Sequence, residues 1–245
     1  AISCSFSSPL LVVQSKVYLL PKGLTTIAYE RVFNNHQILT GYKNTVFYTL
    51  LGTAINIILT TMTAYPLSRR DFKARKFITF LFTFTMLFSG GLIPTFLVVR
   101  NLGLMNTVWA LILPGAISSW NMFIMKNYFQ TSIPGELYEA ARIDGCSYAQ
   151  TFFHIMVPQA LPGISTAGVL AFLGFWNEYY WASLVIIDKK LMTIPSLMGQ
   201  FQTSFSTNYN GMLSAIVIIM LPPIIVFCCF SKFFVKAMSG GAVKG

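Results

Sequence analysis

Side chains that could carry out covalent or metal chemistry are sparse in this sequence and do not gather into motifs. The two histidines, His36 and His154, are far apart, and no nucleophile or carboxylate is spaced around either of them as in a catalytic triad. The cysteines form no CxxC pair and no cluster with histidine; they are Cys4, Cys146, Cys228 and Cys229. The sequence therefore predicts no catalytic residue, no metal site and no cofactor on this chain, which we do not expect to be an enzyme.

One carboxylate does lie inside an apolar stretch, beside an amide. Gly174, Asn177, Glu178 and Trp181 occupy positions i, i+3, i+4 and i+7, which share one face of a helix. If that helix continues to Ile187, Glu178 lies about 14 Å from its end at the 1.5 Å rise per residue of an α-helix. A carboxylate in such apolar surroundings is expected to face other helices or a cavity.

The composition explains why that stretch is apolar. Hydrophobic residues make up 55% of the 245, charged residues only 10%, and the mean hydropathy is +0.64, whereas soluble domains carry about 25% charged residues. The net charge of +10 could suggest nucleic acid as a partner. The basic residues instead flank apolar segments, as the positive-inside rule describes, so we expect a membrane protein that binds no nucleic acid.

The apolar segments predict an all-α membrane protein with five visible spans, each about as long as a bilayer core requires. Residues 1–43 are irregular and are expected outside the membrane, with a short helix near residues 25–33. A break or kink is expected in the second span, where Ser89-Gly90-Gly91 and Pro94 interrupt it, and Pro114-Gly115 lies halfway along the third. The predicted spans are 44–67, 77–99, 106–129, 161–187 and 211–235.

The orientation follows from the densest basic run in the chain, residues 68–76, which the positive-inside rule assigns to the cytoplasm. Two further crossings bring residues 131–158 to the same side. Along the first span, threonines, Gly52 and Asn56 recur every three or four residues, which predicts an inward helix face of small and weakly polar side chains.

Residues 133–158 form the one acid-bearing polar island between apolar segments. We expect a helix that begins with Pro134 in its first turn and Ser132 as N-cap, and that ends at Gly145, followed by a second amphipathic helix that leads to Pro158. Two helices this short need a packing partner. Ile133, Leu137, Ala140 and Ala141 share one side, which either packs on this chain's own bundle or receives another protein.

The spacing within this island resembles the EAA loop of ABC importer permeases. Glu139-Ala140-Ala141 is followed after three residues by Gly145, and after nine more by Ile155, one residue and Val157-Pro158. The family pattern has leucine where this chain has Val157, which is a mild departure. In the resembled family this loop is the coupling helix, which docks into a cleft of the cytoplasmic ATPase.

The resemblance extends over essentially the whole chain. Three further segments are similar in sequence to carbohydrate permeases of the maltose-importer type: Arg142-Ile143-Asp144-Gly145, Trp176-Asn177-Glu178 and the tail from Phe233 to Gly245. Within that class the chain looks closest to permeases of Gram-positive-type bacteria for oligosaccharides from plant polysaccharides. The implied fold is a type I ABC importer transmembrane domain of six spans, of which the first would precede Ala1.

The resemblance also implies the partners. A chain of this family is a multi-pass protein of the bacterial cytoplasmic membrane that forms a heterodimer with a second, similar permease. Two ABC ATPase subunits bind ATP and Mg, and an extracellular solute-binding protein delivers the carbohydrate, which crosses by alternating access. This sequence contains no GxxxxGK[ST] phosphate-binding loop, in agreement with ATP hydrolysis on a separate subunit.

Two sets of site residues follow from the resemblance. The expected ATPase-docking residues are Glu139, Ala140, Ala141, Asp144 and Gly145. The expected substrate-pathway residues, whose amides, carboxylate and aromatic rings suit sugar hydroxyls and sugar rings, are Trp176, Asn177, Glu178, Tyr180, Trp181, Asn56 and Asn121. The alternative for the second set is structural, with the aromatics in an outer belt and Glu178 bonded to a neighbouring helix.

Other functions remain open at this stage. An ABC permease for another solute class would share the same motifs. A secondary transporter or channel working alone predicts several charges within the membrane or an inverted repeat, and the sequence shows only Glu178 and no repeat. An intramembrane enzyme needs a catalytic constellation at membrane depth, which is absent from the sequence.

Overall fold

The computed structural model describes residues 2–14, 17–197 and 209–242, and every regular element among them is a helix. The chain forms two compact units, which are described separately. Unit 1 comprises residues 1–49, 99–111 and 176–226, and unit 2 comprises 50–98, 112–175 and 227–245. The last residues of the tail that resembles carbohydrate permeases, 243–245, lie outside the described residues.

Unit 1 begins with the short helices α1 (Ile2–Ser5) and α2 (Pro9–Val13), followed by α3 (Ile27–Phe33), which confirms the helix expected near 25–33. The long helix α4 (His36–Ser68) starts within the segment predicted to be irregular, so residues 36–43 are helical and the prediction of an irregular backbone there is wrong. The reason is local: the Asn35 side-chain oxygen accepts the backbone N–H of Gln37 at 2.9 Å and so caps the start of α4.

The other helices of unit 1 are short, apart from α15 (Tyr209–Ala242), whose first half belongs here. The short ones are α7 (Val108–Ile112), α13 (Tyr180–Val185) and α14 (Ile194–Leu197). Buried Val32, Ile38, Ile194 and Ala215 form the core. The Thr45 hydroxyl, on α4, accepts the backbone N–H of Ile194 at 2.8 Å, which fixes α14 on this core.

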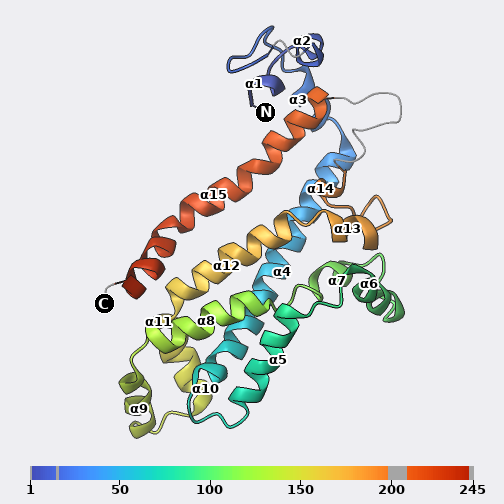
Figure 1. Cartoon of the computed structure of the whole chain (residues 1–245). Coiled ribbons are helices and arrows are strands. Elements are labelled where there is room, and N and C mark those ends of the chain that lie inside the picture. Colours follow the sequence, from blue (N-terminus) through green and yellow to red (C-terminus); the bar gives the residue numbers. More distant parts are fainter. Residues whose placement is uncertain (1, 15–16, 198–208, 243–245) are drawn as a thin grey trace. The chain divides into compact units, whose positions relative to one another are not determined.

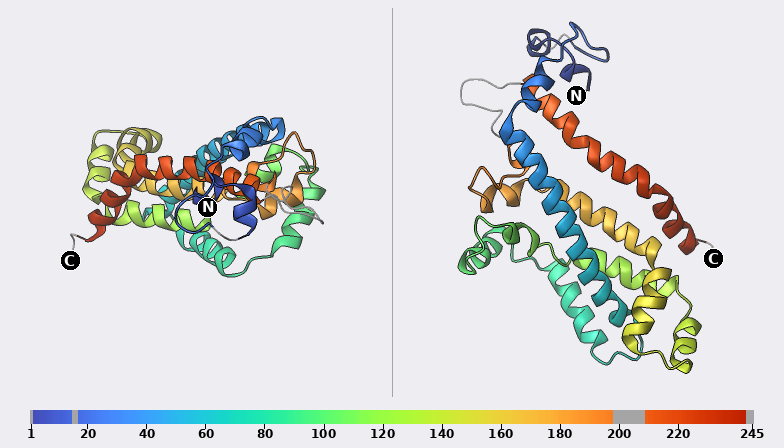
Figure 2. Two further views of the ribbon diagram at one scale, coloured as in Figure 1. Left: turned by 90° about the horizontal axis from the view of Figure 1, so that it is seen from above. Right: turned by 180° about the vertical axis from the view of Figure 1, so that it is seen from behind.

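Unit 2 contains the rest of α4, α5 (Arg75–Leu87), most of α6 (Leu92–Asn101), α8 (Ser119–Thr131) and α12 (Leu161–Trp176), with a group of short helices between α8 and α12 (Figure 1). Its core joins the end of α4 to α8 through Tyr65, Met122, Met125 and Phe129. The α4–α5 turn and the short helices lie at the same end of this unit (Figure 2).

Two helices, α4 and residues 212–231 of α15, are long and apolar enough to cross a membrane, among the residues that the structure describes. Two further pairs qualify only as bent spans: α5 with α6, bent by 114°, and residues 148–159 with α12, bent by 77°. The 114° bend lies at Gly90-Gly91, where Gly91 has φ +83° and Pro94 starts the next turn.

Besides the expected break between α5 and α6, two predicted spans are not continuous helices, and neither of these two breaks was predicted. The 106–129 segment is broken between α7 and α8, at Pro114-Gly115. The 161–187 segment stops at Trp176 and resumes at Tyr180 as α13. The sequence 177–179 contains no proline or glycine, so this second break carries no local breaker signal.

Two glycines, Gly52 and Gly115, leave room for the aromatic ring of Phe175 between three segments of unit 2. A Cβ added at Gly52, on α4, would lie 2.9 Å from the Phe175 ring of α12, and one at Gly115 would lie 3.1 Å from the same ring. Both glycines contact the same edge of the ring, at Cε1 and Cζ, so a side chain added at either position presses on it. The small-residue face predicted along the first span therefore brings α4 close to α12.

We predict that Gly52→Ala destabilises the protein by about 1 to 3 kcal/mol, because the new methyl group overpacks the ring of Phe175. Gly174→Ala is the matched control, since a Cβ there meets no atom within 4 Å and alanine favours the helix. The measurement is the Tm of both purified variants in detergent. Equal Tm values for the two would contradict this packing.

Candidate functional site

The polar island folds into a helical elbow at one end of unit 2. Its first arm is α9 (Gly135–Ile143), which begins after Pro134 at φ −60° and ψ 136°. Ser132, the predicted N-cap, instead ends α8, where its N–H donates to the Tyr128 carbonyl at 2.9 Å. The correction has a physical reason: proline disfavours helical geometry in the residue before it, Ile133, and Pro134 itself is extended, so α9 starts only at Gly135.

The end of α9 is the one predicted at Gly145. Gly145 has φ +73°, the left-handed conformation. Its N–H donates to the Arg142 carbonyl at 3.2 Å, and the Cys146 N–H donates to the Ala141 carbonyl at 3.0 Å. These two bonds make a Schellman motif, which satisfies carbonyls at the helix end and turns the chain sharply.

The second arm is assembled from three short pieces that run on without a gap: α10 (Tyr148–Gln150), the π-helix η1 (Thr151–Met156) and α11 (Val157–Gln159). Ser147 starts it with a capping box, in which its hydroxyl accepts the Gln150 N–H at 3.3 Å and its N–H donates to the Gln150 side chain at 2.8 Å. Pro158 lies inside α11 and does not end the arm, which corrects the predicted stop.

Tyr138 anchors the first arm. Its side chain is 6% exposed and belongs to the same buried cluster as Tyr65, Phe129 and Ile133. The guanidinium of Arg69 lies over the Tyr138 ring as a cation–π contact. Burial raises the pKa of Tyr138 above its ordinary value, against the opposing charge of Arg69, so the phenol stays neutral at physiological pH.

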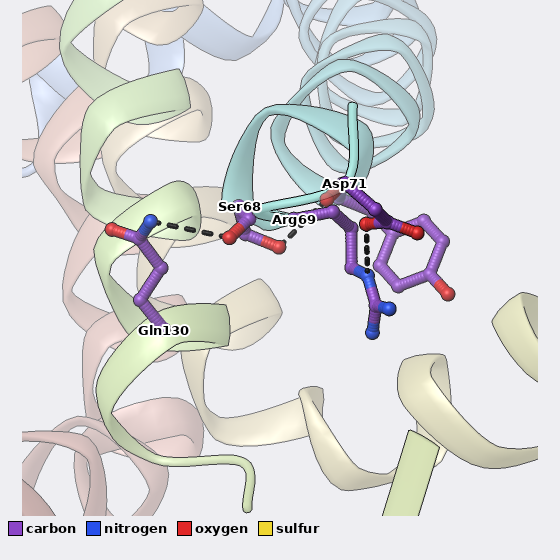
Figure 3. Close-up of polar contacts among 5 residues, drawn as sticks. Ser68, Arg69, Asp71 and Gln130 are labelled. Atoms are coloured by element: carbon purple, nitrogen blue, oxygen red, sulfur yellow. Dashed lines mark hydrogen bonds and ion pairs between the residues drawn. The ribbon is translucent and has the colours of Figure 1, made fainter. Parts of the chain in front are cut away.

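The turn after α4 holds Arg69 in this position (Figure 3). The Arg69 Nε donates to an oxygen of Asp71 at 3.3 Å, and the Gln130 amide of α8 donates to the Ser68 carbonyl at 3.2 Å. Burial acts to raise the pKa of Asp71, but the hydrogen bond from Arg69 and the nearby positive charges outweigh it and lower that pKa. The carboxylate therefore stays ionised beside the guanidinium.

Beside this contact lies an open cleft of about 680 Å³, lined by Tyr138, Glu139 and Arg142 of α9 and by Arg69 and Arg75. The expected common face of α9 is divided. Ile133 and Ala141 are buried, whereas Leu137 and Ala140 are exposed. The four residues predicted to share one face of the helix are therefore divided between the core and the exposed surface. The reason is that Tyr138, and not Leu137, points into the core.

The expected docking residues accordingly fall into two groups. Glu139, Ala140, Asp144 and Gly145 are exposed on the surface of the elbow. Ala141 is 2% exposed and packs inward, behind that surface. Their role in docking stays a prediction.

The expected pathway residues do not come together in one place. Trp176 is 1% exposed, its ring meets Tyr42 edge-on at 6.1 Å, and its indole N–H donates to the Ile219 carbonyl at 3.1 Å, all within unit 1. It therefore packs α15 against the start of α4, and its ring presents no free face in this structure.

Glu178 lies in the break between α12 and α13, and not on one continuous helix face with Gly174 and Asn177 as predicted. Its carboxylate accepts the backbone N–H of Trp181 at 3.0 Å, at the start of α13. An acid at a helix N-terminus is stabilised by the helix dipole. The indole of Trp181 donates to the Ala110 carbonyl at 2.8 Å, whereas Tyr180 is 75% exposed.

Asn56 and Asn121 form a buried polar node in unit 2. The Asn56 amide donates to the Gly115 carbonyl at 2.9 Å, in the break between α7 and α8. The Asn121 amide donates to Asn56 at 3.5 Å and to the Ala167 carbonyl of α12 at 3.4 Å. The node thus ties α4, α8 and α12 together and satisfies a carbonyl that the helix break releases.

Some functional positions escaped the sequence reasoning. Tyr138 lies one residue before the motif and was not singled out, although its buried side chain holds the elbow in position. Arg69 was used only to orient the chain, and no sequence signal pairs it with a tyrosine 69 positions later. The Ser147-to-Gln150 capping box, in contrast, is a pattern that a sequence reading can find.

We predict that Gly145→Ala lowers stability by about 1 kcal/mol, because alanine resists the left-handed conformation. Gly135→Ala is the control: both glycines have open space around a new Cβ, but only Gly145 has positive φ. Thermal unfolding of the two variants measures the difference. A Gly145→Ala protein as stable as Gly135→Ala would refute the turn geometry.

We predict that Tyr138→Ala costs about 3 kcal/mol through the cavity it leaves, and that it frees α9 from the core. Tyr138→Phe keeps the ring under Arg69 and should cost no more than about 1 kcal/mol. Proteolysis at Arg142 in the folded protein reports on α9. If Tyr138→Ala is cleaved no faster than Tyr138→Phe, the tyrosine is not the anchor.

Comparisons with known proteins agree on the kind of protein this is. The chain is 39% identical to the polygalacturonan/rhamnogalacturonan transport system permease protein YtcP of Bacillus subtilis, over 100% of this chain and 90% of that protein. It is 30% identical to the arabinooligosaccharides transport system permease protein AraQ of the same species, over 98% and 86%.

A solved structure shows the same fold. A bacterial ABC transporter involved in the import of the acidic polysaccharide alginate contains a chain that is 31% identical to this one, with a TM-score of 0.87 over 95% of this chain and 88% of that chain. This confirms the expected all-α transmembrane domain of a type I ABC importer. Residues 56–240 match the corresponding family model. The chain therefore belongs to the binding-protein-dependent transport system inner membrane component family, as a multi-pass permease of the cytoplasmic membrane.

Proposed function

We propose that this chain is one of two permease subunits in an ATP-driven importer that moves a carbohydrate, most simply an oligosaccharide, into the bacterial cytoplasm. The second subunit is a similar permease in a heterodimer. Two ABC ATPase subunits bind ATP and Mg on the cytoplasmic side, and an extracellular binding protein supplies the solute.

The elbow at α9 carries this proposal. Tyr138 fixes one face of α9 to unit 2, while Ala140 remains exposed on the opposite face and Glu139 is exposed beside the cleft. A helix held on one side and free on the other can transmit a push from a partner protein to the helices that it packs on. Because Ala140 has only a methyl group, a groove of the ATPase can approach the α9 backbone closely.

Carbohydrate is the proposed substrate class because of what the relatives transport. The two named Bacillus subtilis permeases carry polygalacturonan or rhamnogalacturonan fragments and arabinooligosaccharides, by their names, and the similar solved transporter imports alginate. All three substrates are built from sugar units. The alternative is an ABC permease for another solute class. A stand-alone transporter is less favoured, because it would have no ATPase subunit for the elbow to dock into.

The polar residues near the α12–α13 break are the proposed contacts with the passing sugar. Asn177 and Tyr180 are exposed there, and Glu178 is half-buried. Trp176, Asn56 and Asn121 are buried, and we propose that they hold the helices around the path and do not touch the sugar themselves.

We predict that Ala140→Trp abolishes most of the sugar-stimulated ATP hydrolysis of the reconstituted importer, because the indole blocks close approach to α9. Ala140→Ser is the matched control, since it keeps the surface small at the same position. ATP hydrolysis is measured in proteoliposomes with the binding protein and the candidate oligosaccharide present. The amount of ATPase subunit that copurifies with the permease provides a second readout.

The coupling role fails if Ala140→Trp hydrolyses ATP and retains the ATPase as Ala140→Ser does. The carbohydrate assignment fails separately, if the wild-type importer hydrolyses ATP but responds to no sugar when its own binding protein is present.

A further inference from the structure

A second cleft, on the other side of the α4–α5 turn, is not used by the proposed coupling mechanism. It measures about 660 Å³ and lies between the basic turn, the first half of α5 and Lys126 of α8. Its lining combines cations, hydroxyls and aromatic rings, and comprises Arg70, Asp71, Phe72, Lys73, Arg75, Lys76, Thr79, Phe80, Thr83 and Lys126.

The charge in this cleft is unbalanced. Five of the lining residues are basic and only Asp71 is acidic, and its carboxylate is already paired with Arg69, outside the cleft, at 3.3 Å. Arg69–Asp71 is the ion pair found in the described part of the chain. The cleft is thus a concentrated positive site that lacks an anion of its own.

Lys126 adds a partly buried cation, on a separate helix, to the basic residues of the turn and α5. It lies on α8, half-buried, and its ammonium group donates to the Thr79 hydroxyl of α5 at 3.3 Å. The ring of Phe123 lies 5.5 Å from that nitrogen. A partly buried ammonium group is stabilised by an anion at the same depth.

An apolar track leads out of the cleft along α5. Phe80 is in the lining and is 62% exposed; Phe84 follows one turn later on α5 and Phe88 directly after the end of the helix, 47% and 66% exposed. The ring centroids are 6.3 Å apart for Phe80 and Phe84 and 4.8 Å apart for Phe84 and Phe88. None of the residues of α5 is buried.

We propose that this cleft binds the phosphate headgroup of an anionic phospholipid, with one acyl chain lying along Phe80, Phe84 and Phe88. The cations match the phosphate charge, and the phenylalanine track continues directly into the apolar layer where acyl chains lie. Basic pockets at the cytoplasmic ends of membrane helices bind anionic headgroups in this way. The proposal requires only that the chain lies in a bilayer, so it does not depend on the transported solute.

The test uses the purified importer complex after exchange into detergent, titrated with phosphatidylglycerol or phosphatidylcholine of identical acyl chains and read by native mass spectrometry. We expect the wild type to prefer phosphatidylglycerol. Lys73→Gln, Lys76→Gln and Lys126→Gln together should weaken its binding about a hundredfold, at about fivefold per basic side chain, and leave phosphatidylcholine unchanged.

The matched control removes three lysines in unit 1, with Lys22→Gln, Lys189→Gln and Lys190→Gln, whose side chains are exposed. It should bind phosphatidylglycerol as the wild type does. Should Lys126→Gln impair folding, the Lys73→Gln and Lys76→Gln pair alone is expected to weaken binding about 25-fold, on the same scale.

Three results would overturn the proposal. The first is equal phosphatidylglycerol binding by the wild type and the cleft variant. The second is displacement of the lipid by soluble glycerol 3-phosphate at equal concentration, which would assign the cleft to a free phosphate compound. The third is loss of the ATPase subunit from the cleft variant with lipid binding intact, which would make the cleft a protein contact.

Discussion

The contact between Tyr138 and Arg69 is the interaction on which the candidate site depends. α9 has nine residues and is too short to be stable in water alone. Its position is fixed because one aromatic side chain is buried among Tyr65 and Phe129 and covered by a guanidinium that Asp71 holds in place. The exposed face of α9 then points away from the chain as a geometric consequence.

The helix breaks impose a second constraint. A bilayer core offers no water to backbone groups, so every N–H and C=O released by a break needs a partner within the protein. Side chains supply these partners: Asn56 bonds the Gly115 carbonyl, and Glu178 bonds the Trp181 N–H. The polar residues inside the apolar segments therefore have a structural task, whether or not a substrate also passes them.

The charged turn after α4 lines two different clefts. Arg69 lines the cleft beside α9, Lys73 and Lys76 line the cleft along α5, and Asp71 lines both. One short basic segment thus borders both clefts. Its net positive charge suits both the membrane side it is expected to occupy and an anionic ligand.

Composition, the apolar segments and the motif spacing were enough to determine the class of protein. They predicted a helical membrane permease, a turn at Gly145, and the break at Gly90-Gly91, because glycine, proline and hydropathy act through the local chain. The tertiary structure decided the rest. The break at Asn177, the inward rotation of Tyr138 and the burial of Trp176 depend on contacts with residues distant in the sequence, which no local pattern encodes.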